Sequence, residues 1–552
     1  MNDQSTVVKP TGGAQRRWLS VLLGLLLLLP AAVCCGTSLA APTVRTVIYS
    51  LNNISPIGQG QFVGAQNFAR LPALTGLGAA VGFTLAIAVV RLLAVAVVPP
   101  VLGLAAAALS GWLRGGLRLL FTLPLALFAP TALAAGWVLS SRGPGSALAS
   151  PGAARILVLL IDGLMALGVG CGLALMAYVA ARHTGSDRDA QAPAARGPAV
   201  VVWVVMAAAA LASGLQAFSL PYVLTGGGPG TATTTLAILA YRLAWAQLRF
   251  GPAAALASIT LAFLAVLGLA VWGVVVLGRM GLEVAPRDTL PARSAGAAIV
   301  IALMAAVLAV ALWYGSQAPL VQALFIGLGA LPGAASPFAQ PGVLTNTFLP
   351  PLAVLLIQLP VAYLAALGIG ALRPLGRASE WLLLPFSPWL FVTVGPLSVA
   401  AFLSLRDMKQ LNTTAALLTP IWVSVPMLFV LTLFFKGAGR RWQAARAAGA
   451  SATGTFLRQV IGPSVPLALL LGGLGMLASS QELMWSAIAS AQQLTANVGI
   501  AKVVGQFTAR PAELAAGIRL AVLPAFGLTF VVLAVLELLY VDRLALRRLP
   551  AE

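Results

Sequence analysis

Long apolar runs constrain this chain more than any other feature. About twelve segments of roughly 20 residues are nearly free of charge, so each can cross the hydrocarbon core of a bilayer as a helix. A helix satisfies its own backbone hydrogen bonds, which lipid cannot do. The fold class that we predict is therefore all-α, a polytopic membrane protein. The predicted spans are residues 18–41, 76–99, 119–141, 156–181, 198–219, 252–278, 294–314, 347–372, 381–403, 411–435, 465–488 and 516–541.

Composition excludes a water-soluble fold. Hydrophobic residues make up 60% of the 552 residues and charged residues only 8%, whereas soluble domains carry about a quarter charged residues. The net charge of +20 would indicate a nucleic-acid partner if the basic residues clustered on one soluble face. They lie instead in short stretches between apolar runs, so we expect the lipid bilayer as partner and no nucleic acid.

Basic residues also predict the orientation. With the N-terminus in the cytoplasm, the inside segments hold about twice as many Lys and Arg as the outside segments. This bias places both termini in the cytoplasm and the protein in the inner (plasma) membrane. The first run follows Arg16 and Arg17 and ends near Ala40 and Ala41, like a signal peptide. It is longer than a usual signal-peptide core, so we expect a retained transmembrane helix.

The predicted spans divide into six and six around the polar stretch 281–293. We therefore predict two domains, residues 1–293 and residues 294–552. Each half ends with a basic inside loop, a helix, a polar outside loop, a last helix and a basic tail. Such a parallel duplication is common in transporters whose pathway lies between two halves.

Catalytic and cofactor signatures are missing from the sequence. A phosphate-binding loop needs Gly-Lys followed by Ser or Thr, but the four lysines are followed by Pro, Gln, Gly and Val. The three cysteines have no metal-binding spacing, and His183 is the single histidine. We expect no enzyme activity, no cofactor and no metal, so any ATPase that drives this protein must be a separate chain.

Three acidic residues lie within predicted spans: Asp162, Glu482 and Glu537. Intramembrane acids often mark proton or sodium coupling. Each could equally be a group hydrogen-bonded inside the helix bundle, and Arg91 in the second span could pair with one of them. Both interpretations stay open on the sequence.

The inside loop 436–466 is the most informative segment. Helix formers run from Arg440 to Ala448, Gly449 then breaks the helix, and an amphipathic stretch with Phe456 follows. A short helix and one glycine turn at the membrane surface suit docking into a groove of a partner. The alternative is a basic interfacial helix that only anchors the loop.

This loop resembles the coupling loop in permeases of type I ABC importers, which reads Glu-Ala-Ala, three residues, Gly-Ala and then an aromatic residue. The matching positions are Gln443, Ala444, Ala445, Gly449, Ala450 and Phe456, with Gln443 in an acidic position of the family. The resemblance implies ABC ATPase subunits on the cytoplasmic face and transport by alternating access. The first half has no such pattern in 181–198, so we predict a degenerate coupling loop there.

A second motif, YVLTGGGPG from Tyr222, resembles the sugar and glycerol-3-phosphate branch of these permeases. Three glycines and a proline leave little side-chain bulk, which lets a partner approach closely; a plain surface turn is the alternative. The resemblance implies docking of an extracytoplasmic solute-binding protein. The docking candidates are Thr225, Gly226, Gly227, Gly228, Pro229 and Gly230, and the candidate residues of the substrate pathway are Gln216, Tyr222, Glu482 and Trp485.

We therefore expect two permease subunits of an ABC importer fused in one chain, moving a sugar or sugar-like solute. Fused permeases for iron or thiamine are the alternatives within the family. Outside it, an ion-coupled secondary transporter would use one of the intramembrane acids, and a non-transporting remnant of a permease is a third possibility.

Overall fold

The computed structural model describes residues 12–54, 60–141, 146–182, 196–285, 296–326, 333, 336–506 and 510–549. In this part of the chain, nine helices are long and apolar enough to cross a membrane, and two bent helix pairs raise the number to as many as eleven. The protein is thus a helical, multi-pass membrane protein, as predicted. The spanning helices are α1 (Gly12–Cys35) with α2 (Ala41–Ser50), α4 (Leu77–Ala96) with α5 (Val98–Ala106), α8 (Pro151–Ala181), α9 (Arg196–Leu215) with α10 (Ser219–Thr225), α12 (Phe250–Leu277), α13 (Gly296–Phe325), α14 (Val343–Leu367) with η8 (Gly368–Leu372), α17 (Ala452–Phe456) with η11 (Leu457–Ile461) and α18 (Gly462–Ser480), and α21 (Pro511–Leu539).

Two predicted spans are bent rather than straight. Helix α6 (Gly111–Ala126) meets α7 (Pro130–Ser140) at 78°, and the 3-10 helix η9 (Gly376–Trp389) meets α15 (Val394–Asp407) at 77°. Ala129 has non-helical backbone, with φ −146° and ψ 74°, because the ring of Pro130 disfavours helical geometry in the residue before it. The predictions of unbroken spans at 119–141 and 381–403 were therefore wrong in geometry.

The predicted span 411–435 was wrong in its first half. A short 3-10 helix, η10 (Thr414–Leu417), is followed by non-helical residues, and α16 (Val425–Ala447) begins only after them. Pro426 lies in the first turn of α16, where its missing N–H costs nothing. Helix α16 then continues past the apolar run into the basic stretch.

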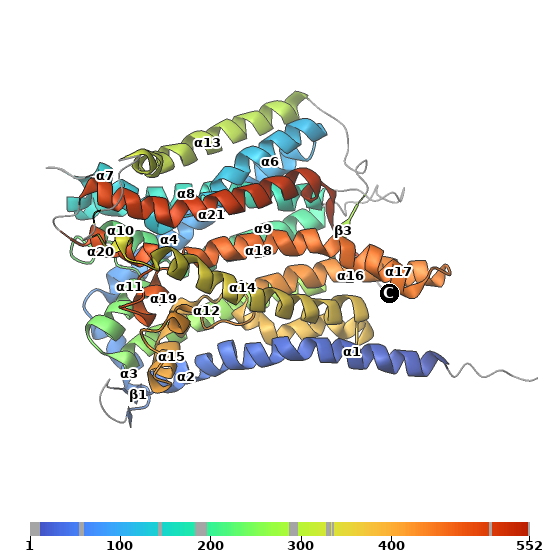
Figure 1. Ribbon diagram of the computed structural model, residues 1–552, viewed down its shortest axis with the longest axis horizontal. Coiled ribbons are helices and arrows are strands. Elements are labelled where there is room, and N and C mark those ends of the chain that lie inside the picture. The colour runs from blue at the N-terminus through green and yellow to red at the C-terminus, as the bar shows by residue number, and fades with distance from the viewer. Residues whose placement is uncertain are drawn as a thin grey trace, which may run out of the picture.

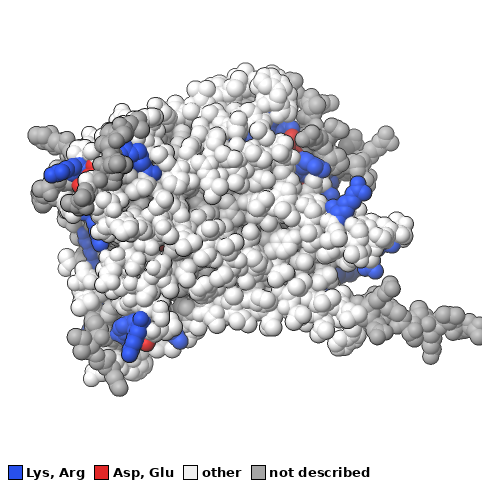
Figure 2. All heavy atoms as spheres, viewed as in Figure 1, with Lys and Arg blue, Asp and Glu red and all other residues white. Residues whose placement is uncertain are grey.

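On the face of the bundle that is seen in Figure 1 and Figure 2, charged side chains lie at the two ends. Figure 1 shows the start of α1, the strand β3 (Met280–Val284) and α17 at one end, which we call the α17 end. The opposite end carries α3 (Gln66–Arg70), α11 (Leu236–Tyr241), α20 (Ala496–Val504) and the small hairpin of β1 (Asn52–Asn53) and β2 (Gln61–Phe62). In the view of Figure 2, Lys, Arg, Asp and Glu gather at these two ends, with a broad band of other residues between them. A bilayer requires this distribution.

Similar elements occur in the same order before and after residue 290. Gly76 and Gly342 both have left-handed backbone, with φ +86° and +93°, and each precedes a long helix, α4 or α14. A bent helix pair and further long helices follow in both parts. Each part ends in a short strand, β3 or β4 (Leu544–Arg548).

These two parts are interlocked. Helix α1 of the N-terminal part packs on α14 and η8, and α13 of the C-terminal part packs on α5, α7 and α8. A Cβ on Gly368 would lie 2.6 Å from the carbonyl oxygen of Gly24, which shows how closely α1 approaches η8. Strands β3 and β4 pair antiparallel, Met280 with Arg548 and Val284 with Leu544. The first helices are thus exchanged and the last strands joined.

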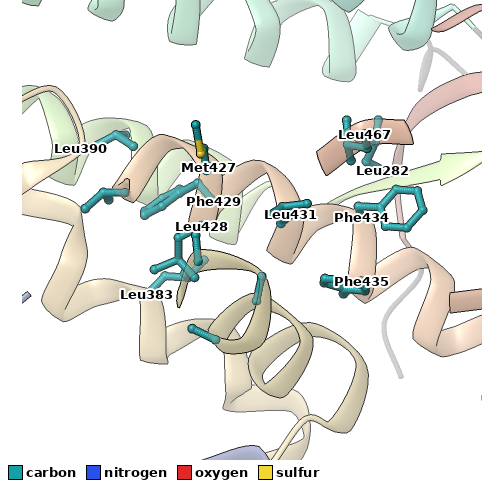
Figure 3. Packing of buried hydrophobic residues seen from close by; sticks show 14 of the residues in the cluster. Leu282, Leu383, Leu390, Met427, Leu428, Phe429, Leu431, Phe434, Phe435 and Leu467 are labelled. Atoms are coloured by element: carbon teal, nitrogen blue, oxygen red, sulfur yellow. The ribbon is translucent and has the colours of Figure 1, made fainter. Parts of the chain in front are cut away.

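The largest buried cluster surrounds α16. Figure 3 shows its side chains, with Leu428, Leu431, Phe434 and Phe435 on α16. Leu282 of β3 belongs to the same cluster, which also includes Leu467 of α18. Burial of one such side chain contributes about 1.5–3 kcal/mol in water, but helices in lipid gain mainly from close packing. Helix α16 is therefore held from several sides along its apolar part.

Candidate functional site

The resemblance to a coupling loop falls on the turn between α16 and α17, residues 443–456, which we call the α16–α17 turn. Helix α16 ends at Ala447, and Gly449 follows with φ +89°, a conformation that side chains with a Cβ rarely adopt. The N–H of Ala450 donates to the oxygen of Ala445 and that of Gly449 to the oxygen of Arg446, both at 3.0 Å. This pair of bonds is a Schellman motif. The predicted helix break at Gly449 is confirmed.

Aromatic contacts hold the two arms of this turn together. The rings of Trp442 and Phe456 lie 5.0 Å apart at 66°, and the indole N–H of Trp442 donates to the oxygen of Ala452 at 3.0 Å. The guanidinium of Arg446 lies 5.1 Å from the Trp442 ring centroid, within cation–π range. No residue of α17 is buried, and nothing lies within 4 Å of the Cβ position of Gly449. The turn is a stiff element whose outer surface is open.

The same helix is fixed to the β3–β4 sheet just before the turn. Arg441 donates to the oxygen of Val284 at 2.7 Å and lies 3.6 Å from the carboxylate of Glu283. A Cβ on Gly437 would lie 2.5 Å from the oxygen of Leu282, so only glycine permits this approach. Movement of the turn would therefore be passed to β3, the last described element of the N-terminal part before residue 286.

Of the four pathway candidates, Gln216 is the one placed between the two parts. Its amide oxygen accepts from the N–H and the hydroxyl of Thr393, at 2.9 and 2.8 Å, and its amide nitrogen donates to the oxygen of Phe391 at 2.8 Å. Gln216 also borders a cavity of about 490 Å³, within the size range of ligand sites. The other polar side chains on this cavity are those of Arg91, Ser213 and Ser219, and its aromatic side chains are those of Phe128 and Phe218.

Tyr222 and Trp485 contribute packing rather than free surface. The ring of Tyr222 is stacked on Phe218 at 4.8 Å and meets Tyr241 edge-on at 5.5 Å. Trp485 is only 1% exposed, and its indole N–H donates to the oxygens of Ala416 and Leu418. The sequence did not reveal that the indole N–H of Trp485 is already hydrogen-bonded.

Glu482 lies in a separate polar cleft between α14, α18 and α20. Its carboxylate accepts from the backbone N–H of Trp485 at 3.1 Å. The space available there is about 10 Å³, enough for roughly one water molecule. Sequence reasoning missed the amides of Asn346 and Asn497, which line this cleft with Glu482. Two asparagines at the ends of apolar runs were the available signal.

The glycine-rich loop is folded back on itself. Gly226, Gly227 and Gly230 all have positive φ. The hydroxyls of Thr233 and Thr234 donate to the oxygens of Gly228 and Gly227, both at 2.9 Å. Among residues 225–230 only Gly230 is exposed. A partner at this loop would therefore meet Gly230 and the adjoining Thr231, while the other glycines serve the tight folding of the loop.

Two of the intramembrane acids lie beside arginines. Asp162, which is fully buried, accepts from Arg91 through both carboxylate oxygens at 2.7 Å. Of the two interpretations that the sequence left open, the structure shows the pairing of Arg91 with an intramembrane acid. Glu537 lies 4.0 Å from Arg118, which also pairs with Asp542. The bidentate Arg–carboxylate pair satisfies both oxygens of Asp162, so this acid has a structural partner inside the helix bundle.

Comparison with known proteins adds no family assignment: no protein-family model matches the chain, and no curated protein matches it. The loop 181–198, predicted to be a degenerate coupling loop, lies mostly outside the described residues.

Proposed function

We propose that this protein is the membrane-spanning permease of an ABC importer, with two permease subunits fused in one chain, and that it moves a sugar-like solute across the inner membrane. Both termini then lie in the cytoplasm, at the α17 end. Separate ATPase subunits supply the energy, and an extracytoplasmic binding protein delivers the solute at the opposite end.

The α16–α17 turn is the observation that carries the proposal. It is exposed, it is stiffened by the Schellman motif and the Trp442–Phe456 contact, and it continues into α16, whose side chains belong to the largest buried cluster. Such an element can transmit a displacement from a partner to the core. An interfacial anchor would need neither the rigid turn nor the attachment of Arg441 to β3.

The placement of Gln216 supports a pathway between the two parts. Alternating access requires a contact that differs between two states, and the bonds from Gln216 to Phe391 and Thr393 join the parts across such a boundary. The pairing of Asp162 with Arg91 does not favour the ion-coupled alternative.

The test is recovery of the ATPase with the tagged full-length chain from membranes, measured by mass spectrometry. Gly449→Gln adds a side chain at the exposed tip and should lower recovery of an ABC ATPase by about tenfold or more, as a change at an interface hot spot does. Gly376→Gln is the matched control, because Gly376 also has positive φ, +58°, at the same end of the bundle, with nothing within 4 Å of its Cβ position.

If ATPase recovery falls equally in both variants, backbone strain at a glycine with positive φ explains the loss, and the α16–α17 turn is not the contact site. If no ABC ATPase accompanies the unmodified protein, the proposal fails. Solute uptake that collapses with an uncoupler while cellular ATP stays constant would instead establish the ion-coupled alternative.

A further inference from the structure

A basic cavity lies at the α17 end, apart from the α16–α17 turn and from the cavity at Gln216. Its volume is about 310 Å³, roughly ten times the volume that one water molecule takes in the liquid. Residues from both parts of the chain line it: the end of α12, the η8–η9 segment, α16 and the residue after β4. The lining residues are Val276, Leu277, Arg279, Arg373, Arg377, Glu380, Trp381, Lys436, Arg440 and Leu549.

The charge of this cavity is strongly unbalanced. Five of the lining side chains are cationic and one, Glu380, is acidic. Glu380 is shared: its carboxylate lies 2.7 Å from the Nζ of Lys436 and 3.7 Å from Arg373. Arg279 and Arg377 also line the cavity and are exposed, so their positive charge can attract an anion to it. Arginine side chains suit a phosphate group in particular, because their planar fork matches its oxygens.

Two of the apolar side chains that line the cavity are exposed on the surface of the bundle. Leu277, at the end of α12, is 70% exposed, and Trp381 is 51% exposed. The Trp381 ring meets Trp272 edge-on at 5.0 Å. A tryptophan beside basic residues is typical of the level where lipid headgroups lie.

We propose that this cavity binds the phosphate group of an anionic phospholipid, with the acyl chains running along α12 and η9. Basic pockets between transmembrane helices bind such headgroups elsewhere. A free phosphate carries the same charge but would make no apolar contact with Leu277 or Trp381. We therefore assign the site to a lipid, whose acyl chains can contact these two side chains. The proposal does not depend on the transport function.

The test compares lipid binding to purified full-length protein by native mass spectrometry. The unmodified protein should retain phosphatidylglycerol in preference to phosphatidylcholine. The double variant Arg279→Gln with Arg377→Gln removes two exposed charges and leaves the Lys436–Glu380 pair intact. It should weaken phosphatidylglycerol binding by about 30-fold. Thermal unfolding checks that the variant is folded.

The matched control is Arg182→Gln with Arg458→Gln, which removes two exposed charges outside the cavity. Its phosphatidylglycerol binding should stay unchanged. Equal weakening in both double variants, or no preference for phosphatidylglycerol in the unmodified protein, would overturn the proposal. Displacement of the lipid by millimolar inorganic phosphate would overturn the lipid assignment and point to a soluble anion.

Discussion

At the scale of single residues, the Arg91–Asp162 pair decides how the N-terminal part tolerates charge inside the membrane. Asp162→Asn leaves the Arg91 guanidinium without its counter-ion beside the 490 Å³ cavity. Removing one partner of a buried pair costs about 3–5 kcal/mol. We expect a marked fall in the thermal unfolding temperature in detergent, measured by tryptophan fluorescence.

A double variant tests whether the two charges stabilise the protein as a pair. Arg91→Met with Asp162→Leu removes both charges, and we expect it to recover most of the lost stability, because buried ion pairs are often replaceable by apolar residues. If the double variant is no more stable than Asp162→Asn alone, the two side chains do not act as a pair.

Trp442 determines the stiffness of the α16–α17 turn. Trp442→Ala removes the contact with Phe456 and the hydrogen bond to Ala452. We expect faster amide hydrogen exchange in the turn, by roughly tenfold for a loss of about 1.4 kcal/mol, with little change in the core of α16. Trp442→Phe keeps the ring contact and should show a smaller effect. Unchanged exchange in Trp442→Ala would show that the turn is held by its backbone alone.

At the scale of elements, glycines decide how closely helices approach. The Cβ position of Gly268 on α12 clashes with the carbonyl oxygen of Ser387 on η9. Gly273 lies on the same helix with nothing within 4 Å of its Cβ position. Gly268→Ala should therefore destabilise the protein by about 1–3 kcal/mol through overpacking.

Gly273→Ala is the matched control, and it should be neutral or slightly stabilising because alanine favours helix. Thermal unfolding of both variants in the same detergent measures the difference. Equal unfolding temperatures would show that α12 and η9 can move apart without cost.

Sequence reasoning found the elements that composition alone specifies. Apolar runs identified the nine helices of the described residues that can cross a membrane, and helix formers followed by Gly449 identified the helix break in the α16–α17 turn. It did not find the bends between α6 and α7 or between η9 and α15, because the hydropathy of a segment does not report the angle between consecutive helices. The sequence could not predict the basic cavity either, because its arginines come from separate segments of the chain that only tertiary packing brings together.

At the scale of the whole molecule, the two parts are held together by packing, because α1 and α13 each pack against the other part. Each part lends its first helix to the other, and β3 pairs with β4. We expect a chain cut within residues 286–295 to assemble when both pieces are produced together. A tag on one piece should then recover the other in equal amount.

Each piece produced alone should be degraded. Its first helix would lack the helices of the other part on which it packs, and the surface that normally contacts the other part's first helix would be exposed. Stable accumulation of either piece by itself would contradict the interlocked arrangement. Production of the intact chain under the same conditions is the control.

The interlocked arrangement of the two parts also explains an advantage of having both in one chain. Two parts with the same order of elements present similar surfaces, so a pool of separate pieces would have the opportunity to assemble like with like. Joining them in one chain places the correct mate at a high effective concentration and fixes the ratio at one to one. In the assembled bundle, the packing between the parts then supplies most of the stability. The covalent connection acts earlier, because it disfavours homodimers of either part while the bundle forms.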